Sequence, residues 1–142
     1  MNTSIFTVAG PVMIGPSSSH TAGAAKLGRV ARQICDHKFD RVEFFLHGSF
    51  ALTGKGHGTD KALLAGVMGI KEDDARLPES FEIAEKEGLG FSFGEITLEN
   101  AHENSVRINF YDGDELIVSV EGASIGGGEI VITKIDGYDV KI

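Results

Sequence analysis

Two short segments combine residue types that can bind an anion and move a proton. Residues 15–23 read Gly-Pro-Ser-Ser-Ser-His-Thr-Ala-Gly, and residues 54–60 read Gly-Lys-Gly-His-Gly-Thr-Asp. In both, a threonine follows the histidine within two residues and a helical pattern comes next. A helix N-terminus carries unpaired N–H groups and partial positive charge, so a carboxylate or phosphate is the expected ligand. We therefore expect the two segments to form two walls of one small-anion site.

The histidines of these segments, His20 and His57, are the candidate proton carriers. Each is expected just before a helix N-terminus, whose positive end disfavours the imidazolium and lowers the imidazole pKa. A neutral imidazole is the form that accepts a proton as a general base. Taken singly, a segment like the first is usually only a helix cap and one like the second is usually only a turn. Their recurrence in one small chain favours a site.

The other histidines, the cysteine and the glycine run give weaker evidence of a functional site. His37 and His47 lie near the ends of predicted elements and indicate structural or surface roles, whereas Cys35 falls on an apolar helix side and indicates a core residue. The three glycines at residues 126–128 suit either a strand bulge or a set of N–H groups facing an anion. The five histidines lack the spacing of a metal site, and the sequence has no Walker motif, dinucleotide fingerprint or nucleophile elbow.

Composition narrows the class of protein. The 142 residues suit one domain, 1–142, and a net charge of −8 argues against a nucleic-acid or anionic-membrane surface. The single cysteine can neither form a disulfide within the chain nor hold an iron–sulfur cluster by itself. Without a secretory pattern or an apolar run of membrane-spanning length, a reducing cytoplasm is the expected location.

The hydrophobic period changes from helical to alternating near Gly90. An α+β fold follows, with helices packed on one face of a mixed, largely antiparallel sheet. The expected helices are residues 22–35 or 22–36 (capped by Ser19 or Thr21), a buried helix 61–70 (capped by Thr59 or Asp60) and a helix that starts at Pro78 and has Gly88 just past its end. The expected strands are residues 41–46, 91–98, 105–111, 115–120, 129–133 and 138–142, with a short strand or lead-in at 4–9.

Residues 10–32, Gly-Pro-Val-Met-Ile-Gly-Pro-Ser-Ser-Ser-His-Thr-Ala-Gly-Ala-Ala-Lys-Leu-Gly-Arg-Val-Ala-Arg, resemble the signature of the β subunit of iron–sulfur-dependent bacterial L-serine dehydratases. Gly-Ser-Phe-Ala at 48–51, the segment 54–60, His-Glu-Asn at 102–104 and Ser-Ile-Gly-Gly-Gly at 124–128 also match, in the order of the family. The resemblance covers essentially the whole chain.

The resemblance implies a reaction and a partner. L-serine loses water to give aminoacrylate, which hydrolyses to pyruvate and ammonia, a step of amino-acid catabolism that can feed gluconeogenesis. A [4Fe-4S] cluster held by cysteines of an α subunit binds the substrate through one free iron and acts as a Lewis acid. The β domain is expected to resemble the allosteric substrate-binding domain of phosphoglycerate dehydrogenases and to complete the active-site cleft. An ACT regulatory domain usually follows in the family, and we expect it to be absent after Ile142.

The resemblance also implies roles for those residues of this chain that match the motifs of the family. The resemblance assigns the base to His57, with His20 as the alternative, and gives the substrate site a wall whose members are Ser18, Ser19, His20, Thr21, Gly58 and Thr59. It assigns Asn104 no derivable role and gives this chain no metal ligand. Two other hypotheses remain open: a regulatory domain that binds serine or another anion without catalysis, and a dimerising scaffold with residues 106–110 or 138–142 as sheet edges. A homodimer is also expected as a possible assembly of the enzyme subunit.

Overall fold

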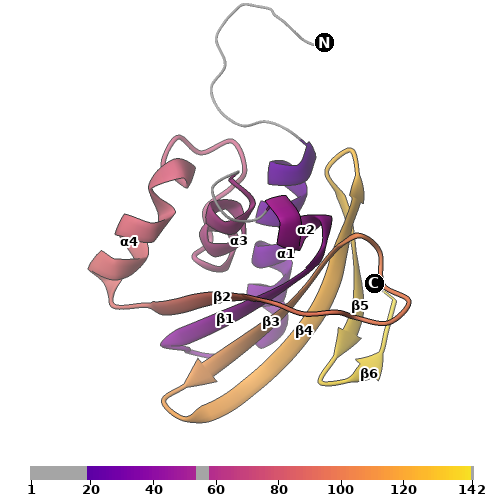
Figure 1. The fold of residues 1–142 in the computed structure, drawn as a ribbon. Helices are drawn as coiled ribbons and strands as arrows, with labels where there is room; N and C mark the ends of the chain where they lie inside the picture. Colours follow the sequence, from indigo (N-terminus) through magenta and orange to yellow (C-terminus); the bar gives the residue numbers. More distant parts are fainter. Residues whose placement is uncertain (1–18, 54–57, 142) are drawn as a thin grey trace, which may run out of the picture.

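The computed structural model describes residues 19–53 and 58–141. Its order of elements is helices first and hairpins second, as the change of period predicts (Figure 1). The helices are α1 (Ser19–Cys35), α2 (Ser49–Thr53), α3 (Thr59–Val67), the 3-10 turn η1 (Leu77–Glu79) and α4 (Ser80–Glu87). The strands are β1 (Arg41–Gly48), β2 (Gly90–Glu95), β3 (Asn104–Asp112), β4 (Glu115–Gly126), β5 (Glu129–Ile135) and β6 (Tyr138–Asp139).

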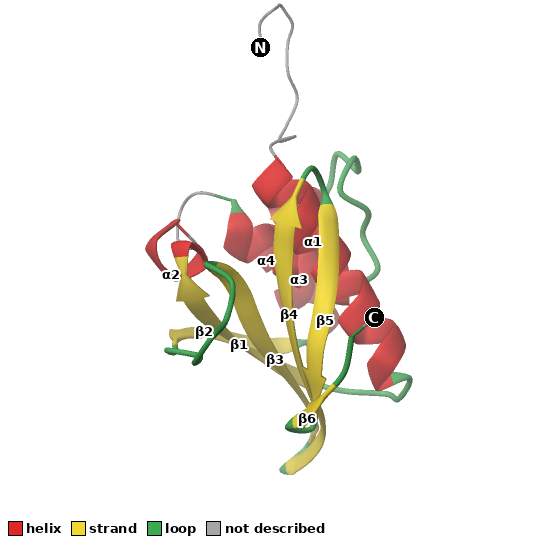
Figure 2. Ribbon diagram, turned by 90° about the vertical axis from the view of Figure 1, so that its right-hand side faces the viewer, coloured by secondary structure: helices red, strands yellow, loops and turns green. Residues whose placement is uncertain are grey.

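The six strands form one mixed sheet in the order β2-β1-β3-β4-β5-β6. Only the β1–β2 pair is parallel, because α2, α3 and α4 carry the chain back between them, and the other four pairs are antiparallel. Helices α1, α3 and α4 cover one face of this sheet (Figure 2). The predicted α+β class is therefore confirmed.

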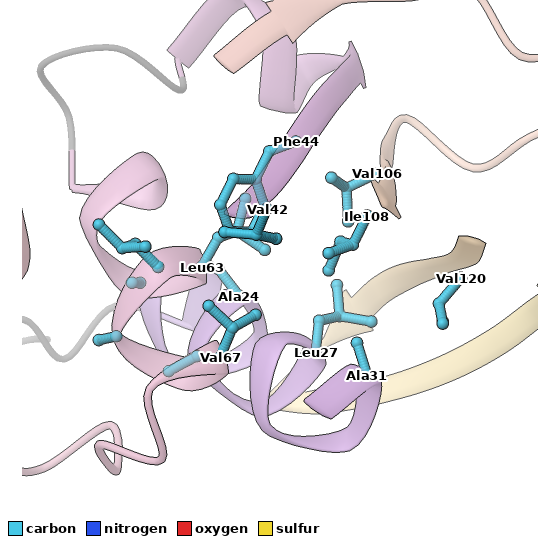
Figure 3. Close-up of a cluster of buried hydrophobic side chains, with 14 of the residues drawn as sticks. Ala24, Leu27, Ala31, Val42, Phe44, Leu63, Val67, Val106, Ile108 and Val120 are labelled. Carbon is cyan, nitrogen blue, oxygen red and sulfur yellow. The ribbon is translucent and has the colours of Figure 1, made fainter. Parts of the chain in front are cut away.

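The core lies between that face and the helices. Val42, Phe44 and Leu46 alternate along β1 toward the helices and are at most 1% exposed, as a strand with one buried face requires. Leu27 of α1 and Leu63 of α3 meet this layer (Figure 3). No helix of the described residues is long and apolar enough to cross a membrane.

Helices α1 and α3 run parallel, side by side. A Cβ added to Gly28 would lie 2.9 Å from the Cα of Gly66, and one added to Gly66 would lie 2.8 Å from the Cα of Gly28. Further along, Arg32 of α1 donates a hydrogen bond to the carbonyl of Val67 at 2.9 Å. Small residues thus let the two backbones touch, and both helices begin at the same end of the fold.

Several predicted boundaries are wrong. Helix α1 begins at Ser19, so His20 and Thr21 occupy its first turn, where the N–H groups lack helical partners and hydroxyl residues are tolerated. Helix α3 has Gly58 as its N-cap, in the left-handed region, instead of Thr59 or Asp60. It ends at Val67, three residues early, because Gly69 adopts a φ of 84° and closes a Schellman turn. The short helix α2 was not predicted, and the predicted strand at 4–9 lies outside the described residues.

The proposed sheet edges also need correction. Residues 106–110 belong to β3, which lies between β1 and β4 and has no free edge. The β6 edge is real but comprises only Tyr138–Asp139 among the described residues. The remaining edge is β2, which the sequence had not indicated as an edge.

Candidate active site

Segments that lie far apart in the sequence meet at one end of the sheet. Gly48, the last residue of β1, pairs with Asn104 at the start of β3, and Ser105 pairs with Ala123 near the end of β4. The start of α1, helix α2 and the turn between β4 and β5 all lie at this end, at the top of Figure 1. We call it the motif end, because all five family-like segments contribute described residues to it, segment 54–60 through Gly58.

The first two segments approach each other at Thr21 and Gly58. A Cβ added to Gly58 would lie 3.7 Å from Thr21 Oγ1, which is ordinary van der Waals contact. Gly58 has a φ of 93°, a conformation that favours glycine, and its carbonyl accepts the first helical hydrogen bond of α3 from Ala62 at 2.9 Å. Thr21 is 5% exposed and Thr59 is 2% exposed. The predicted convergence of the two segments is present at these residues.

The glycine-rich turn between β4 and β5 packs on the first turns of α1. Gly23 lies so close to Ser124 that a Cβ on this glycine would overlap the serine side chain, and a Cβ on Gly128 would lie 4.0 Å from Ala22. Residues 126–128 have φ values of 110°, 64° and 80°, so three successive positions favour glycine. A β-bulge lies between Ser124 and Gly126, as one of the two sequence interpretations proposed.

The segment at 102–104 closes the motif end next to α2. The N–H of Ser49 donates to the carbonyl of Glu103 at 2.8 Å, and Gly48 meets the same carbonyl with a φ of 63°. His102 accepts a hydrogen bond at Nδ1 from the Asn104 N–H at 3.0 Å. This histidine therefore shapes the turn that leads into β3.

The electrostatics of the motif end come from two helix dipoles and one buried carboxylate. Because α1 and α3 start side by side, their positive N-terminal ends add at one place and favour an anionic ligand. Asp60, in the first turn of α3, is 6% exposed and accepts a hydrogen bond from the Lys61 N–H at 2.8 Å. Sequence reasoning treated Asp60 only as a cap. A carboxylate directly before a helix that is apolar nearly all round was the signal that it would be buried here.

Comparison with known proteins identifies the family. The profile described as serine dehydratase beta chain matches residues 4–89. A protein of Peptoniphilus asaccharolyticus, named L-serine dehydratase, beta chain, is 50% identical over 141 residues, covering 97% of this chain. This chain belongs to the serine dehydratase β-chain family. A Bacillus subtilis protein named probable L-serine dehydratase, beta chain, is 42% identical over 98% of this chain, and L-serine dehydratase 1 of Escherichia coli is 35% identical over 90%.

The chain spans only part of these relatives. It covers 63% of each of the two β chains and 33% of the Escherichia coli protein. The family membership confirms the resemblance found in the sequence.

The family's expected site residues fall into two groups. Thr21, Gly58 and Thr59 are brought together at the motif end, and Ser19 and His20 open helix α1 there. Ser18 and His57 lie outside the described residues. The assignment of the base to His57 or His20 remains a prediction.

The other titratable residues have structural contacts. Cys35 is 3% exposed at the end of α1, where burial raises the pKa of its thiol, and the predicted core role is confirmed. His37 Nδ1 lies 3.0 Å from the Cys35 carbonyl oxygen, and His47 Nδ1 accepts from the Leu98 N–H at 3.0 Å. His37 thus holds a local turn and His47 joins two segments distant in the sequence, so both have the structural role that was predicted.

The chain's own residues do not fit an iron–sulfur cluster. Such a cluster needs several thiolates, and the one cysteine of the sequence lies at the end of α1 opposite to Thr21. The described residues also contain no group of three or more histidine, cysteine, aspartate or glutamate side chains placed to hold a metal ion.

Proposed function

We propose that this chain is the β subunit of an L-serine dehydratase, which converts L-serine to pyruvate and ammonia together with an α subunit. The observation that carries the proposal is the meeting of separate family segments at the motif end, where Thr21 lies close to Gly58. The packing of α1 on α3 brings the first two segments together, and the polar and glycine-rich composition of the segments suits a shared ligand or partner surface.

The substrate carboxylate is the group we assign to the paired N-termini of α1 and α3. Two adjacent positive helix ends suit a carboxylate, and the segments around them carry hydroxyl groups that donate hydrogen bonds. In this proposal the binding wall comprises Ser18, Ser19, His20, Thr21, Gly58 and Thr59. Its function is to fix the orientation of serine, so that one face of Cα is presented to the base.

We assign the removal of the Cα proton to His57, with His20 as the second candidate. His57 directly precedes Gly58 in the chain, and Gly58 meets the binding wall at Thr21. A neutral imidazole accepts the Cα proton as the Cβ–O bond breaks, and this proton and the departing hydroxide together account for the water that is lost. The aminoacrylate product then hydrolyses to pyruvate and ammonia.

The [4Fe-4S] cluster is assigned to the α subunit, because this chain offers one buried thiol far from the motif end. The unpaired, buried Cys35 and the proposed cluster both suit a reducing cytoplasm. Two relatives are named as β chains, and these names support an α-type partner.

Activity of reconstituted variants tests the assignment of the base. We expect the complex of a His57→Ala chain with a cluster-loaded α chain to lose at least about a hundredfold in kcat, with little change in subunit affinity. His37→Ala is the matched control, since His37 contacts the Cys35 carbonyl away from the motif end. Full activity of His57→Ala combined with inactivity of His20→Ala would move the base to His20. Full activity of both would remove the base from this chain.

A non-catalytic domain that binds serine is the alternative function. Calorimetry of the isolated chain with L-serine distinguishes this alternative from the β-subunit function. If the α subunit completes the site, the two helix ends of this chain alone are expected to bind serine only weakly. Tight binding to the chain alone, unchanged by addition of the α subunit, would favour the alternative.

A further inference from the structure

The two edges of the sheet differ in how well they are protected. At one edge, β6 has two residues, and Lys134 and Asp139 form an ion pair there at 3.4 Å. At the other, β2 has six residues with neither proline nor lysine, and Glu95 is its one charged residue. Native proteins usually shorten or charge an edge strand that must stay unpaired. Strand β2 has neither form of protection.

The alternation of backbone groups along a strand shows which N–H and C=O groups of β2 face away from β1. The N–H of Gly90 donates to Asp40 and the N–H of Ile96 donates to Leu46, so these residues face β1. Backbone groups alternate in direction along a strand, so the N–H and C=O groups of Phe91, Phe93 and Glu95 point outward. No hydrogen bond within the described part of the chain reaches the outward groups of the two phenylalanines.

The sequence of this strand is a palindrome. Residues 90–94 read Gly-Phe-Ser-Phe-Gly, centred on Ser92. In an antiparallel pairing of two copies about Ser92, Phe91 of each copy lies opposite Phe93 of the other, and their outward groups exchange four hydrogen bonds. Ser92 then faces its own equivalent as a non-hydrogen-bonded pair. The direction of the backbone groups and the palindromic sequence therefore favour the same register.

The side chains suit this register on both faces. Toward the helices, Phe93 stacks on Phe44 with centroids 4.8 Å apart, and Phe91 packs on Phe81 at 5.1 Å, so the aromatic rows are already ordered. On the opposite face, Gly90, Ser92 and Gly94 carry no bulky side chains, and Arg41 and Phe45 of β1 lie beside the two glycines. Glu95 lies opposite Leu89 of the second copy, so the register does not bring two carboxylates together.

We propose that two copies of this chain pair through β2 in this antiparallel register and form one continuous twelve-stranded sheet around a two-fold axis at Ser92. An isologous contact of this kind closes on itself, and the short β6 edges limit further growth. The partner is a second copy and not an unrelated strand, because only a self-complementary sequence gains from the palindrome. The contact uses a lateral edge and leaves the motif end open to an α subunit.

Charges placed at Ser92 test the two-fold axis. We expect sedimentation of the 142-residue chain to give twice its 15.1 kDa mass. Ser92→Lys should weaken dimerisation at least about fivefold, because it sets like charges directly opposite each other, and so should Ser92→Glu. Mixing the two variants should restore the dimer as a heterodimer. A variant that merely misfolds cannot be rescued in this way. Tyr138→Lys, at the exposed opposite edge, is the matched control and should leave the mass unchanged.

A cysteine at the same position tests the register. Ser92→Cys should form a disulfide-linked dimer on mild oxidation, because non-hydrogen-bonded pairs bring Cα atoms to about 4.5 Å. Cys35→Ser in the same chain removes the native thiol as a source of cross-links. A monomeric mass for the unaltered chain up to roughly 0.2 mM, or a dimer that the lysine and glutamate variants leave unaffected, would overturn the proposal.

Discussion

Thr21 and Gly58 lie close together at the adjoining N-termini of α1 and α3, where a Cβ added to Gly58 would reach van der Waals contact with Thr21 Oγ1 at 3.7 Å. This proximity follows from the parallel packing of the two helices, which Gly28 and Gly66 allow further along. One helix pair thus both builds the core and brings two family segments to the same place. Stability and function therefore depend on different ends of the same interface.

Gly58→Ala tests the contact at the motif end. The added methyl group and the positive φ of 93° should shift the segment before α3, and we expect kcat/KM of the reconstituted enzyme to fall at least about tenfold. Gly88→Ala is the matched control, since Gly88 has a φ of 78° with no heavy atom within 4 Å of its added Cβ. Both variants should lose about 1 kcal/mol of stability, but only the first should lose activity. An equal loss of activity in both would contradict the assignment.

Gly23 and Ser124 test the packing of the β4–β5 turn on α1. Gly23→Ala creates an overlap with the Ser124 side chain, so we expect a loss of about 2 kcal/mol in the free energy of urea unfolding. Ser124→Gly in the same chain removes the obstructing atoms and should recover most of that loss. Additive effects of the two substitutions in a double-mutant cycle would mean that the residues are not in contact.

Gly66→Ala tests the crossing of α1 and α3. In an ordinary helix this change stabilises by about 1 kcal/mol, but here the new Cβ would overlap the carbonyl of Ala25 and the backbone of Gly28. We expect a net destabilisation of about 2–3 kcal/mol in urea unfolding. Glu85→Ala, on the exposed side of α4, should change stability by less than about 0.5 kcal/mol. A stabilised Gly66→Ala protein would show that the helices are further apart.

The sequence allowed the layers and most strands to be predicted, because periodicity reports which face of an element is buried. Val42, Phe44 and Leu46 alternate in the sequence and are buried in the structure. The strong cap residues misled the prediction at helix starts: Thr59 and Asp60 have capping side chains, yet Gly58 forms the N-cap because a left-handed residue turns the chain there.

Tertiary contacts account for the features that sequence patterns could not predict. The pairing of Gly23 with Ser124 joins residues 101 positions apart, and no local period encodes it. The parallel β1–β2 pair places β2 at an edge, a position that the sequence pattern of residues 91–98 does not indicate. The sequence predicted that segments 15–23 and 54–60 would meet, but the arrival of the segments at 48–51, 102–104 and 124–128 at the same end depends on the register of β1, β3 and β4.

Tyr111 and Glu43 give a pH test on the sheet face opposite the helices. A hydrogen bond from the Tyr111 hydroxyl to the Glu43 carboxylate, aided by burial, raises the pKa of Tyr111 above its usual value of 10.0. The neutral phenol is thus favoured in the folded state. The resulting stabilisation is fully present below pH 10.0 and is lost as the pH rises through the higher folded pKa.

Glu43→Gln should therefore move the Tyr111 pKa back toward 10.0, as measured by tyrosinate absorbance in a Tyr138→Phe background. In this background Tyr111 alone gives the tyrosinate signal, because the sequence has two tyrosines and no tryptophan. The difference in stability between the chain with Glu43 and its Glu43→Gln variant should shrink at alkaline pH. An unchanged Tyr111 titration would contradict the hydrogen bond.

The most direct test of the proposed β-subunit function is pyruvate formation from L-serine in an anaerobic mixture with a cluster-loaded α chain of a two-chain L-serine dehydratase. We expect no pyruvate from either chain alone, pyruvate from the pair, and a loss of at least about tenfold when the pair contains the Gly58→Ala variant of this chain. Pyruvate from this chain alone, or a stable complex of the two chains that forms none, would contradict the proposal that the motif end completes the active site.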